Sequence, residues 1–183
     1  MISLAALWLP IVLSAVIVFI ASSIMHMVLP YHKSDYHPLP NEDNVRAALR
    51  GVKPGLYMMP FCSHEKMKSP EIQAKFQEGP VGHITMLPSG PPNMGSYLGK
   101  WFGFCLIVGL FSAYLASRTL APGTDYLQVF RVAGTAAFMA YGLGNLSYSI
   151  WKGMPLGVTL KEVVDGLVYG LLTGGTFGWL WPR

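Results

Sequence analysis

Long apolar stretches and one long polar stretch make up the pattern of this chain. The apolar stretches cover residues 4–29, 98–120, 126–151 and 159–181, and the polar stretch covers residues 31–97. A helix needs about 20 mainly apolar residues to cross the hydrocarbon core of a bilayer, which is about 30 Å thick. Each apolar stretch reaches that length. The pattern therefore predicts an all-α polytopic membrane protein, a single membrane domain over residues 1–183 with four transmembrane helices.

The first apolar stretch has a competing interpretation as a cleaved signal peptide, because the small residues at 21–23 resemble a cleavage site. The residues before the stretch include no Lys or Arg. The apolar run is also longer than the roughly 7–15 residues of a signal peptide's apolar region. Both observations favour a retained first transmembrane helix.

The polar segment is too long to be a simple connection. Asn41 can cap a short helix over residues 39–51, and Ser69 followed by Pro70 can begin another that ends at Gly79. Residues 56–61 and 83–87, bounded by Pro and Gly, are expected to be extended. We therefore expect a small cap of mixed structure on the membrane surface, between the first and second transmembrane helices.

Capping signals predict where the last two helices begin. Asp125 stands before the third helix, with Gln128 three residues later. Thr159 and Glu162 form a Thr-x-x-Glu capping box, which satisfies backbone N–H groups at a helix start. The third helix is therefore expected to start after Asp125 and the fourth at Thr159.

Four glycines, Gly166, Gly170, Gly174 and Gly178, recur at every fourth position of the last apolar stretch. Residues spaced by four lie on one face of a helix, and small residues there let another helix backbone approach closely in a membrane. We expect this stripe to pack against the second or third helix, most closely at Gly170 and Gly174. Asn145 and Asp165 enter the bilayer from the same side, so a hydrogen bond between them is expected to support the packing.

Composition and charge agree with a membrane protein. The chain is 52% hydrophobic and 12% charged, whereas soluble domains carry about 25% charged residues. Its net charge is +4, without the basic run that tracks nucleic acid, so the bilayer is the expected partner and nucleic acid is not. The expected location is the bacterial inner (plasma) membrane.

The positive charges near the predicted helix ends indicate an orientation. On the side of the polar segment lie Lys33, Lys100, Lys152 and Lys161, and on the side of the termini lie Arg118, Arg131 and Arg183. Cytoplasmic loops carry the excess of Lys and Arg. The small excess predicts a cytoplasmic polar segment, with both termini outside the cytoplasm.

Soft metal-ligating residues gather in and before the polar segment. They are Met25, His26, Met27, His32, His37, Met58, Met59, Cys62, His64 and Met67. Thioether, thiolate and imidazole together suit Cu(I). The spacing matches no known ligand motif, and the alternative is that the histidines lie at the membrane interface while the methionines fill gaps in a small core. Copper is therefore the one cofactor that the sequence suggests.

Other chemistry finds less support in the sequence. The second, third and fourth predicted helices contain no His, which excludes a pair of axial haem ligands on those helices. Ser63, His64 and Glu65 are adjacent, so their side chains point apart in most conformations and form no catalytic triad. The Gly-Pro-Pro stretch at 90–92 lacks the Lys and the following helix of a phosphate-binding loop.

Two functions follow as expectations. The first is a non-enzymatic accessory or assembly subunit, whose helices pack against other membrane subunits or against a second copy of the chain. The second is a copper-handling membrane protein or a small membrane metalloenzyme that uses the Met, His and Cys cluster. The strong packing motifs and weak catalytic motifs favour the first.

Overall fold

The computed structural model describes residues 2–183, in which the chain forms two compact units. The first unit consists of the residues up to Asp35 and those from Asn93 to Arg183. The second unit, Tyr36–Pro92, is the polar segment. Most of the chain is helical, and the two strands belong to the second unit.

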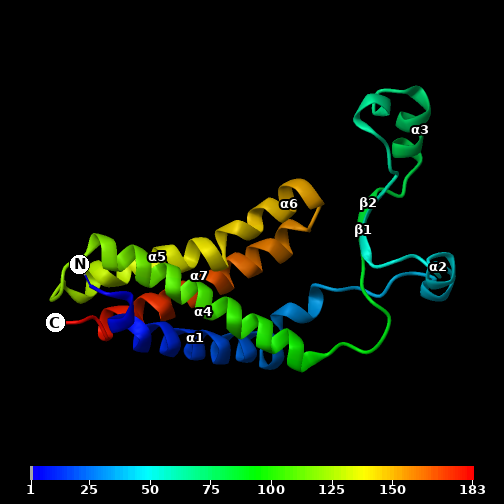
Figure 1. Ribbon diagram of the computed structural model, residues 1–183. Helices are drawn as coiled ribbons and strands as arrows, with labels where there is room; N and C mark the ends of the chain where they lie inside the picture. Colours follow the sequence, from blue (N-terminus) through cyan, green and yellow to red (C-terminus); the bar gives the residue numbers. More distant parts are fainter. Residues whose placement is uncertain (1) are drawn as a thin grey trace. The chain divides into compact units, whose positions relative to one another are not determined.

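The first unit is a bundle of long helices (Figure 1). They are α1 (Trp8–Ser23), α4 (Met94–Thr119), α5 (Tyr126–Tyr141) and α7 (Leu156–Trp179), with the short α6 (Leu146–Lys152) between the last two. A 3-10 turn precedes α1 and a π-helical turn, Ile24–Val28, follows it. Two helical segments, Leu4–Val28 and Met94–Thr119, are long and apolar enough to cross a membrane.

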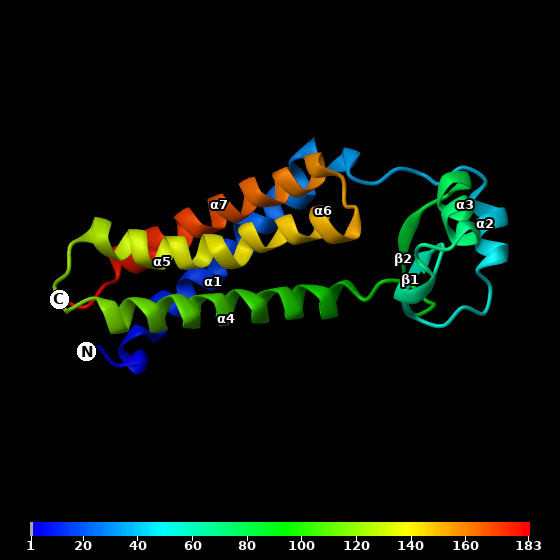
Figure 2. The ribbon, with the colours of Figure 1, turned by 90° about the horizontal axis from the view of Figure 1, so that it is seen from above.

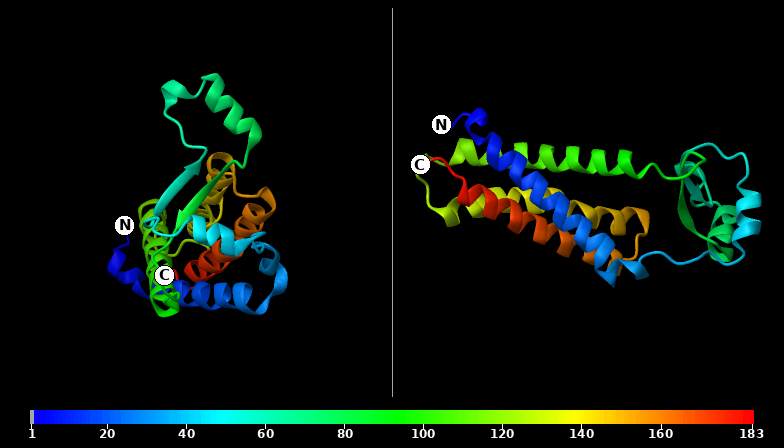
Figure 3. Two further views of the ribbon diagram at one scale, coloured as in Figure 1. Left: turned by 90° about the vertical axis from the view of Figure 1, so that its right-hand side faces the viewer. Right: turned by 90° about the horizontal axis from the view of Figure 1, so that it is seen from below.

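Helix order within the first unit brings the two chain ends together. Both termini lie at the same end of this unit (Figure 2). Helix α1 runs diagonally across the bundle, from α4 near its start toward the beginning of α7 near its end (Figure 3). The residues that follow α1 therefore lie beside the first turns of α7.

Many small residues are buried inside the bundle, beside a few large side chains such as Phe177 and Leu7, and many large apolar residues face outward. Ala15, Ala113, Ala116, Ala133 and Ala137 are at most 1% exposed. The large residues Trp8, Ile20, Ile107, Phe111 and Leu171 are 48–63% exposed. In a soluble protein the large apolar residues would be the buried ones. Small interior residues with an apolar outer surface are instead typical of helices that pack within lipid.

The glycine stripe of α7 lies against α5. A Cβ atom built on Gly170 would lie 3.0 Å from the carbonyl oxygen of Gly134, and one on Gly174 would lie 2.7 Å from that of Phe130. Similar collisions would occur at Gly166 and Gly178. The stripe therefore packs within the chain, helix backbone against helix backbone.

The closest approach is at Gly166, not at Gly170 or Gly174 as the sequence argument expects. A Cβ atom there would lie 2.3 Å from the Cα of Gly142. Helix α5 ends at Tyr141, and a 3-10 turn, Leu143–Asn145, leads into α6. The predicted continuous helix over 126–151 is thus interrupted where its backbone meets α7.

Helix α7 begins at Leu156, with Pro155 as its N-cap residue. The predicted start at Thr159 is wrong, because Pro155 has a φ of −54°, which fits a helix entrance, and the helix forms from there. Thr159 is fully buried, and its hydroxyl lies 2.9 Å from that of Ser149 on α6. Its side chain joins two helices instead of capping one.

The second unit contains α2 (Glu42–Ala48), α3 (Pro70–Glu78) and an antiparallel pair of strands, β1 (Gly55–Met59) and β2 (Gly82–Met86). The Ser69 hydroxyl accepts a hydrogen bond from the N–H of Ile72, so Ser69 caps α3 as predicted. Gly79 follows α3 with a φ of +68°, a left-handed conformation suited to glycine. The predicted mixture of short helices and extended segments is confirmed, but α2 is shorter than the predicted helix over 39–51, and the Asn41 side chain makes no capping hydrogen bond.

Candidate functional site

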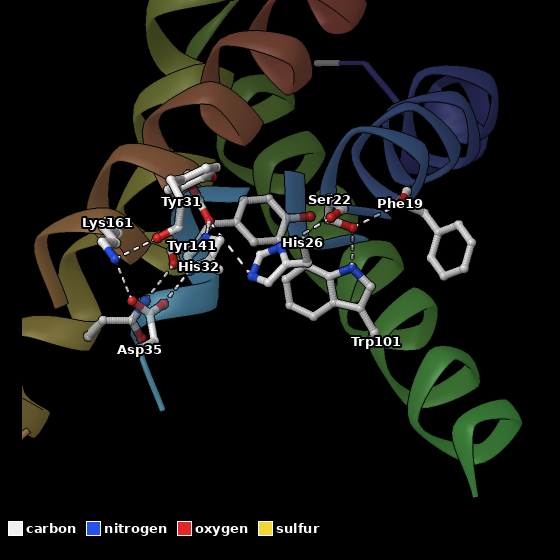
Figure 4. A network of polar contacts seen from close by, with 11 residues as sticks. Phe19, Ser22, His26, Tyr31, His32, Asp35, Trp101, Tyr141 and Lys161 are labelled. Carbon is white, nitrogen blue, oxygen red and sulfur yellow. Dashed lines mark hydrogen bonds and ion pairs between the residues drawn. The ribbon is translucent and has the colours of Figure 1, made fainter. Parts of the chain in front are cut away.

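A network of polar side chains joins the end of the first helical segment to α7 (Figure 4). Its members are His26 in the π-helical turn, Tyr31, His32 and Asp35 around the following 3-10 turn, and Lys161 and Asp165 on α7. Pro30 begins the 3-10 turn, because its fixed φ is compatible with helical geometry while its missing N–H ends the preceding ladder. The chain changes direction at Pro30, and this turn places Tyr31 and His32 against α7.

Asp165 is the centre of the network and is 2% exposed. The Tyr31 hydroxyl donates a hydrogen bond to its Oδ1. Its Oδ2 lies 2.8 Å from Nε2 of His32 and 3.8 Å from Nε2 of His26. Two imidazole nitrogens therefore converge on one oxygen of a buried carboxylate.

The opposite nitrogen of His32 is held by a second carboxylate. Nδ1 of His32 lies 2.5 Å from Oδ2 of Asp35, and Oδ1 of Asp35 accepts a hydrogen bond from Lys161, also at 2.5 Å. Lys161 donates further hydrogen bonds to the carbonyl of Tyr31 and the hydroxyl of Ser34. Asp35 and Lys161 thus fix the orientation of the His32 ring.

His26 is held in the same way by a backbone group. Its Nδ1 lies 3.1 Å from the carbonyl oxygen of Ser22, one helical turn earlier, so an Nδ1–H donated to that oxygen leaves Nε2 as the free nitrogen. The ring stacks on His32, with centroids 4.3 Å apart and planes 12° apart. The hydroxyl of Ser22 accepts a hydrogen bond from Nε1 of Trp101 on α4, which ties this turn to the bundle.

The charges of the network change the pKa values of its members. The hydrogen bond from Lys161, with that from His32, holds the pKa of Asp35 below its usual value. Burial favours neutral His32, but the hydrogen bonds to Asp35 and Asp165 outweigh it and raise the pKa of His32. Burial and the neighbouring Asp165 carboxylate raise the pKa of Tyr31 well above its usual range. The network therefore favours an ionised Asp35 carboxylate between Lys161 and a protonated His32.

This arrangement matches the chemistry of a metal centre. Metal-binding histidines usually hold one ring nitrogen in a hydrogen bond to a carboxylate or backbone carbonyl and bind the ion through the other. Here each Nδ1 has such a partner, and both Nε2 atoms face Asp165. The potential ligand atoms of His26, His32 and Asp165 all lie within 4.8 Å of one another.

A cavity of about 270 Å³ adjoins these residues. Its wall consists of His26, Trp101, Phe104, Ala140, Tyr141, Asn145, Glu162, Asp165 and Tyr169. Two of the three potential ligands, His26 and Asp165, thus lie on its surface. The lining thus includes both aromatic rings and two carboxylates.

Of the metal ligands predicted from the sequence, His26 and His32 lie together in the structure. Met25 is partly buried against the core of the bundle, and Met27 is 74% exposed. His37, Cys62 and His64 belong to the second unit, where the sulfur of Cys62 lies 3.6 Å from that of Met67. The soft donors are therefore divided between the two units.

Asp165 has a different role from the one expected from the sequence. The predicted hydrogen bond between Asn145 and Asp165 is wrong, because Asn145 donates to the carbonyl of Tyr141 and Asp165 is occupied by Tyr31 and His32. The sequence did not indicate Tyr31, Asp35 or Lys161 as residues of the site. The spacing of His32 and Asp35, three residues apart beside a proline, is the one local signal that points to them.

Comparison of the chain with protein-family models, with curated proteins and with solved structures finds no match. The residues of the network and the cavity are therefore the basis for assigning a function.

Proposed function

We propose that this protein is a multi-pass membrane protein that binds a divalent transition-metal ion through His26, His32 and Asp165. The observation that carries the proposal is the convergence of two Nε2 atoms on Oδ2 of Asp165, while both Nδ1 atoms are held by other acceptors. Chain segments more than 130 residues apart supply these groups. A bound ion would take the place of the proton between His32 and Asp165.

The donor set selects the kind of metal. Two imidazole nitrogens and one carboxylate oxygen suit Zn²⁺ and similar divalent ions, whereas Cu(I) prefers sulfur ligands. Asp35 then serves as the outer carboxylate that orients His32, and Tyr31 orients Asp165. This proposal keeps the metal-binding hypothesis but replaces copper with an ion such as Zn²⁺.

Four spans are part of the proposal. With 24 residues, α7 is about 36 Å long, enough to cross the hydrocarbon core. Helix α5, the 3-10 turn and α6 together form the proposed third span over residues 126–152. Lys161 and Asp165 then lie in the first turns of α7, near the membrane surface. We propose the bacterial inner membrane as the location, with the second unit in the cytoplasm.

A metal analysis of the full chain tests the proposal. Protein purified in mild detergent, incubated with Zn²⁺ and freed of excess ion should hold about one equivalent, and Asp165→Asn should hold less than about a tenth. His64→Ala, in the second unit, is the matched control and should keep the metal. A wild-type protein without bound Zn²⁺, or an Asp165→Asn variant that keeps it, would show that the network is a structural ion-pair cluster.

A second candidate function is the accessory or assembly subunit. The glycine stripe gives it no support, because α5 covers that stripe within the chain. The observation that favours it is the second unit's exposed apolar side chains: Leu56 is 63% exposed, Phe61 79% and Leu87 65%. Leu56 and Phe61 line one pocket of the second unit, and contiguous exposed apolar surface outside the bilayer is typical of protein contacts. Identification of chains that co-purify with the full-length protein, or of a homo-oligomer, tests this candidate.

A further inference from the structure

The cavity beside the proposed metal ligands has the features of a substrate site. A catalytic metal ion usually has three protein ligands and keeps one position open for water or substrate. Because His26 and Asp165 line the cavity, an ion held by them and by His32 would lie beside this space. At about 270 Å³ the cavity is slightly smaller than the roughly 300–1,000 Å³ typical of small-molecule sites, so it suits a small reacting group.

Glu162 supplies a carboxylate to the same cavity. Glu162, Asp165 and Tyr169 follow one another at intervals of three and four residues, which places them on one face of α7. Glu162 is half-buried and close enough to His32 and Asp165 to interact with them electrostatically, but within residues 2–183 it is not a partner in the hydrogen bonds of the network. It is therefore available to accept a proton from a water molecule at the open metal position.

Tyr169 supplies an unused hydrogen-bond donor. Its side chain lines the cavity and is 3% exposed, and its hydroxyl has no hydrogen-bond partner in the described part of the chain. A buried hydroxyl without a partner costs about 1–3 kcal/mol, so an acceptor from a ligand is the natural partner for it. The oxygen of a carbonyl group is such an acceptor.

Apart from Asn145, the remaining wall of the cavity consists of Ala140 and three aromatic rings. The rings of Trp101, Phe104 and Tyr141 contact one another there, with centroids 5.6–6.1 Å apart. Such a surface suits a hydrocarbon chain next to the reacting group. The substrate class that fits the whole cavity is an ester or amide with an apolar acyl chain.

We infer that the cavity is the active site of a metal-dependent hydrolase of acyl esters or amides, with Glu162 as the proton acceptor. The inference rests on the proposed metal site. With an ion bound, a water molecule at its open position would lose a proton to Glu162, and the resulting hydroxide would attack the carbonyl carbon. The Tyr169 hydroxyl donates a hydrogen bond to the carbonyl oxygen as negative charge develops on it.

The second half of the reaction returns the proton. The carbon–oxygen or carbon–nitrogen bond breaks, and Glu162 gives its proton to the departing oxygen or nitrogen. The products are a carboxylic acid and an alcohol or amine, so one water molecule is consumed and no electrons are exchanged. The apolar acyl chain remains against Trp101 and Phe104 until release.

The experiment uses the full chain in detergent, loaded with Zn²⁺, and a panel of fluorogenic acyl esters and amides of increasing chain length. Glu162→Gln should keep its Zn²⁺ and lower kcat by at least about 100-fold. Tyr169→Phe should also keep its Zn²⁺ and lower kcat by about tenfold or more. Glu78→Gln, on the exposed face of α3, is the matched control and should retain wild-type turnover.

A second measurement tests the open metal position without any substrate. Octanohydroxamate should bind the Co²⁺-substituted wild-type protein and change its visible spectrum, and Ala140→Trp, which fills the cavity, should abolish the change. The metal-loaded wild-type protein could fail to change its spectrum with the hydroxamate and show a turnover no higher than that of Glu162→Gln. That result would overturn the hydrolase inference alone. A wild-type protein without bound metal overturns the proposed metal site as well.

Discussion

The backbone of Gly166 approaches that of Gly142 so closely that a Cβ atom on Gly166 would lie 2.3 Å from the Cα of Gly142. Non-bonded carbon atoms prefer about 3.5–4.0 Å, so even a methyl group forces the two backbones apart. This contact lies just after the end of α5 and one residue beyond Asp165 on α7. Close helix packing and the position of the buried carboxylate are therefore connected.

Gly166→Ala should destabilise the protein by about 1–3 kcal/mol, the usual cost of overpacking, and lower its melting temperature in detergent. Gly157→Ala is the matched control on the same helix, because a Cβ atom there meets nothing within 4 Å. The control should be neutral or slightly stabilising, since Ala favours helix over Gly. Equal melting temperatures for the two variants would contradict the observed packing of α7 on α5.

Asp35→Asn should weaken Zn²⁺ binding by about 10–100-fold, the usual effect of removing an outer-shell partner of a ligating histidine. The reason is that Asp35 holds Nδ1 of His32 and is itself held by Lys161. Asp43→Asn is the control, because the Asp43 side chain is fully exposed in the second unit. Competition titration with a chromophoric zinc chelator measures the difference, and unchanged affinity in Asp35→Asn would argue against His32 as a ligand.

Ser22→Ala should destabilise the bundle by about 1–3 kcal/mol, because it removes the acceptor of the Trp101 indole N–H. Ser23→Ala is a close control. The hydroxyls of Ser22 and Ser23 both donate to the carbonyl of Phe19, but the hydrogen bond that joins α1 to α4 is made by Ser22. Thermal unfolding in detergent should separate the two variants, and equal losses would show that the indole hydrogen bond contributes nothing.

Reporters of membrane sidedness distinguish four spans from two. Reporters placed after Arg183 and in the turn at Gly123 should appear outside the cytoplasm, and reporters near Asn93 and Gly153 inside it. If α5 and α7 lay on the membrane surface, the reporters at Gly123 and Gly153 would share one side. Labelling that is reversed at every position would keep the four spans and overturn the orientation.

Some features of this protein follow from the residues alone. Apolar stretches of sufficient length predict the helices that become α1 and α4, because hydrophobic length is a local property. Ser69, Pro70 and Gly79 predict the limits of α3 for the same reason, since a helix cap involves only the residues beside it. The spacing of the four glycines indicates a face for close approach, and that face is the one that meets α5.

Other features were decided by tertiary packing. The sequence pattern placed the fourth helix start at Thr159, but Thr159 bonds Ser149 on a neighbouring helix and α7 begins earlier. The histidines suggested a soft metal site with nearby Met and Cys, whereas the partner that His32 finds is Asp165, 133 residues away. The contact between His32 and Asp165 depends on the path of α1 across the bundle and on the turn at Pro30. No local pattern encodes that path, because it results from the packing of whole helices against one another.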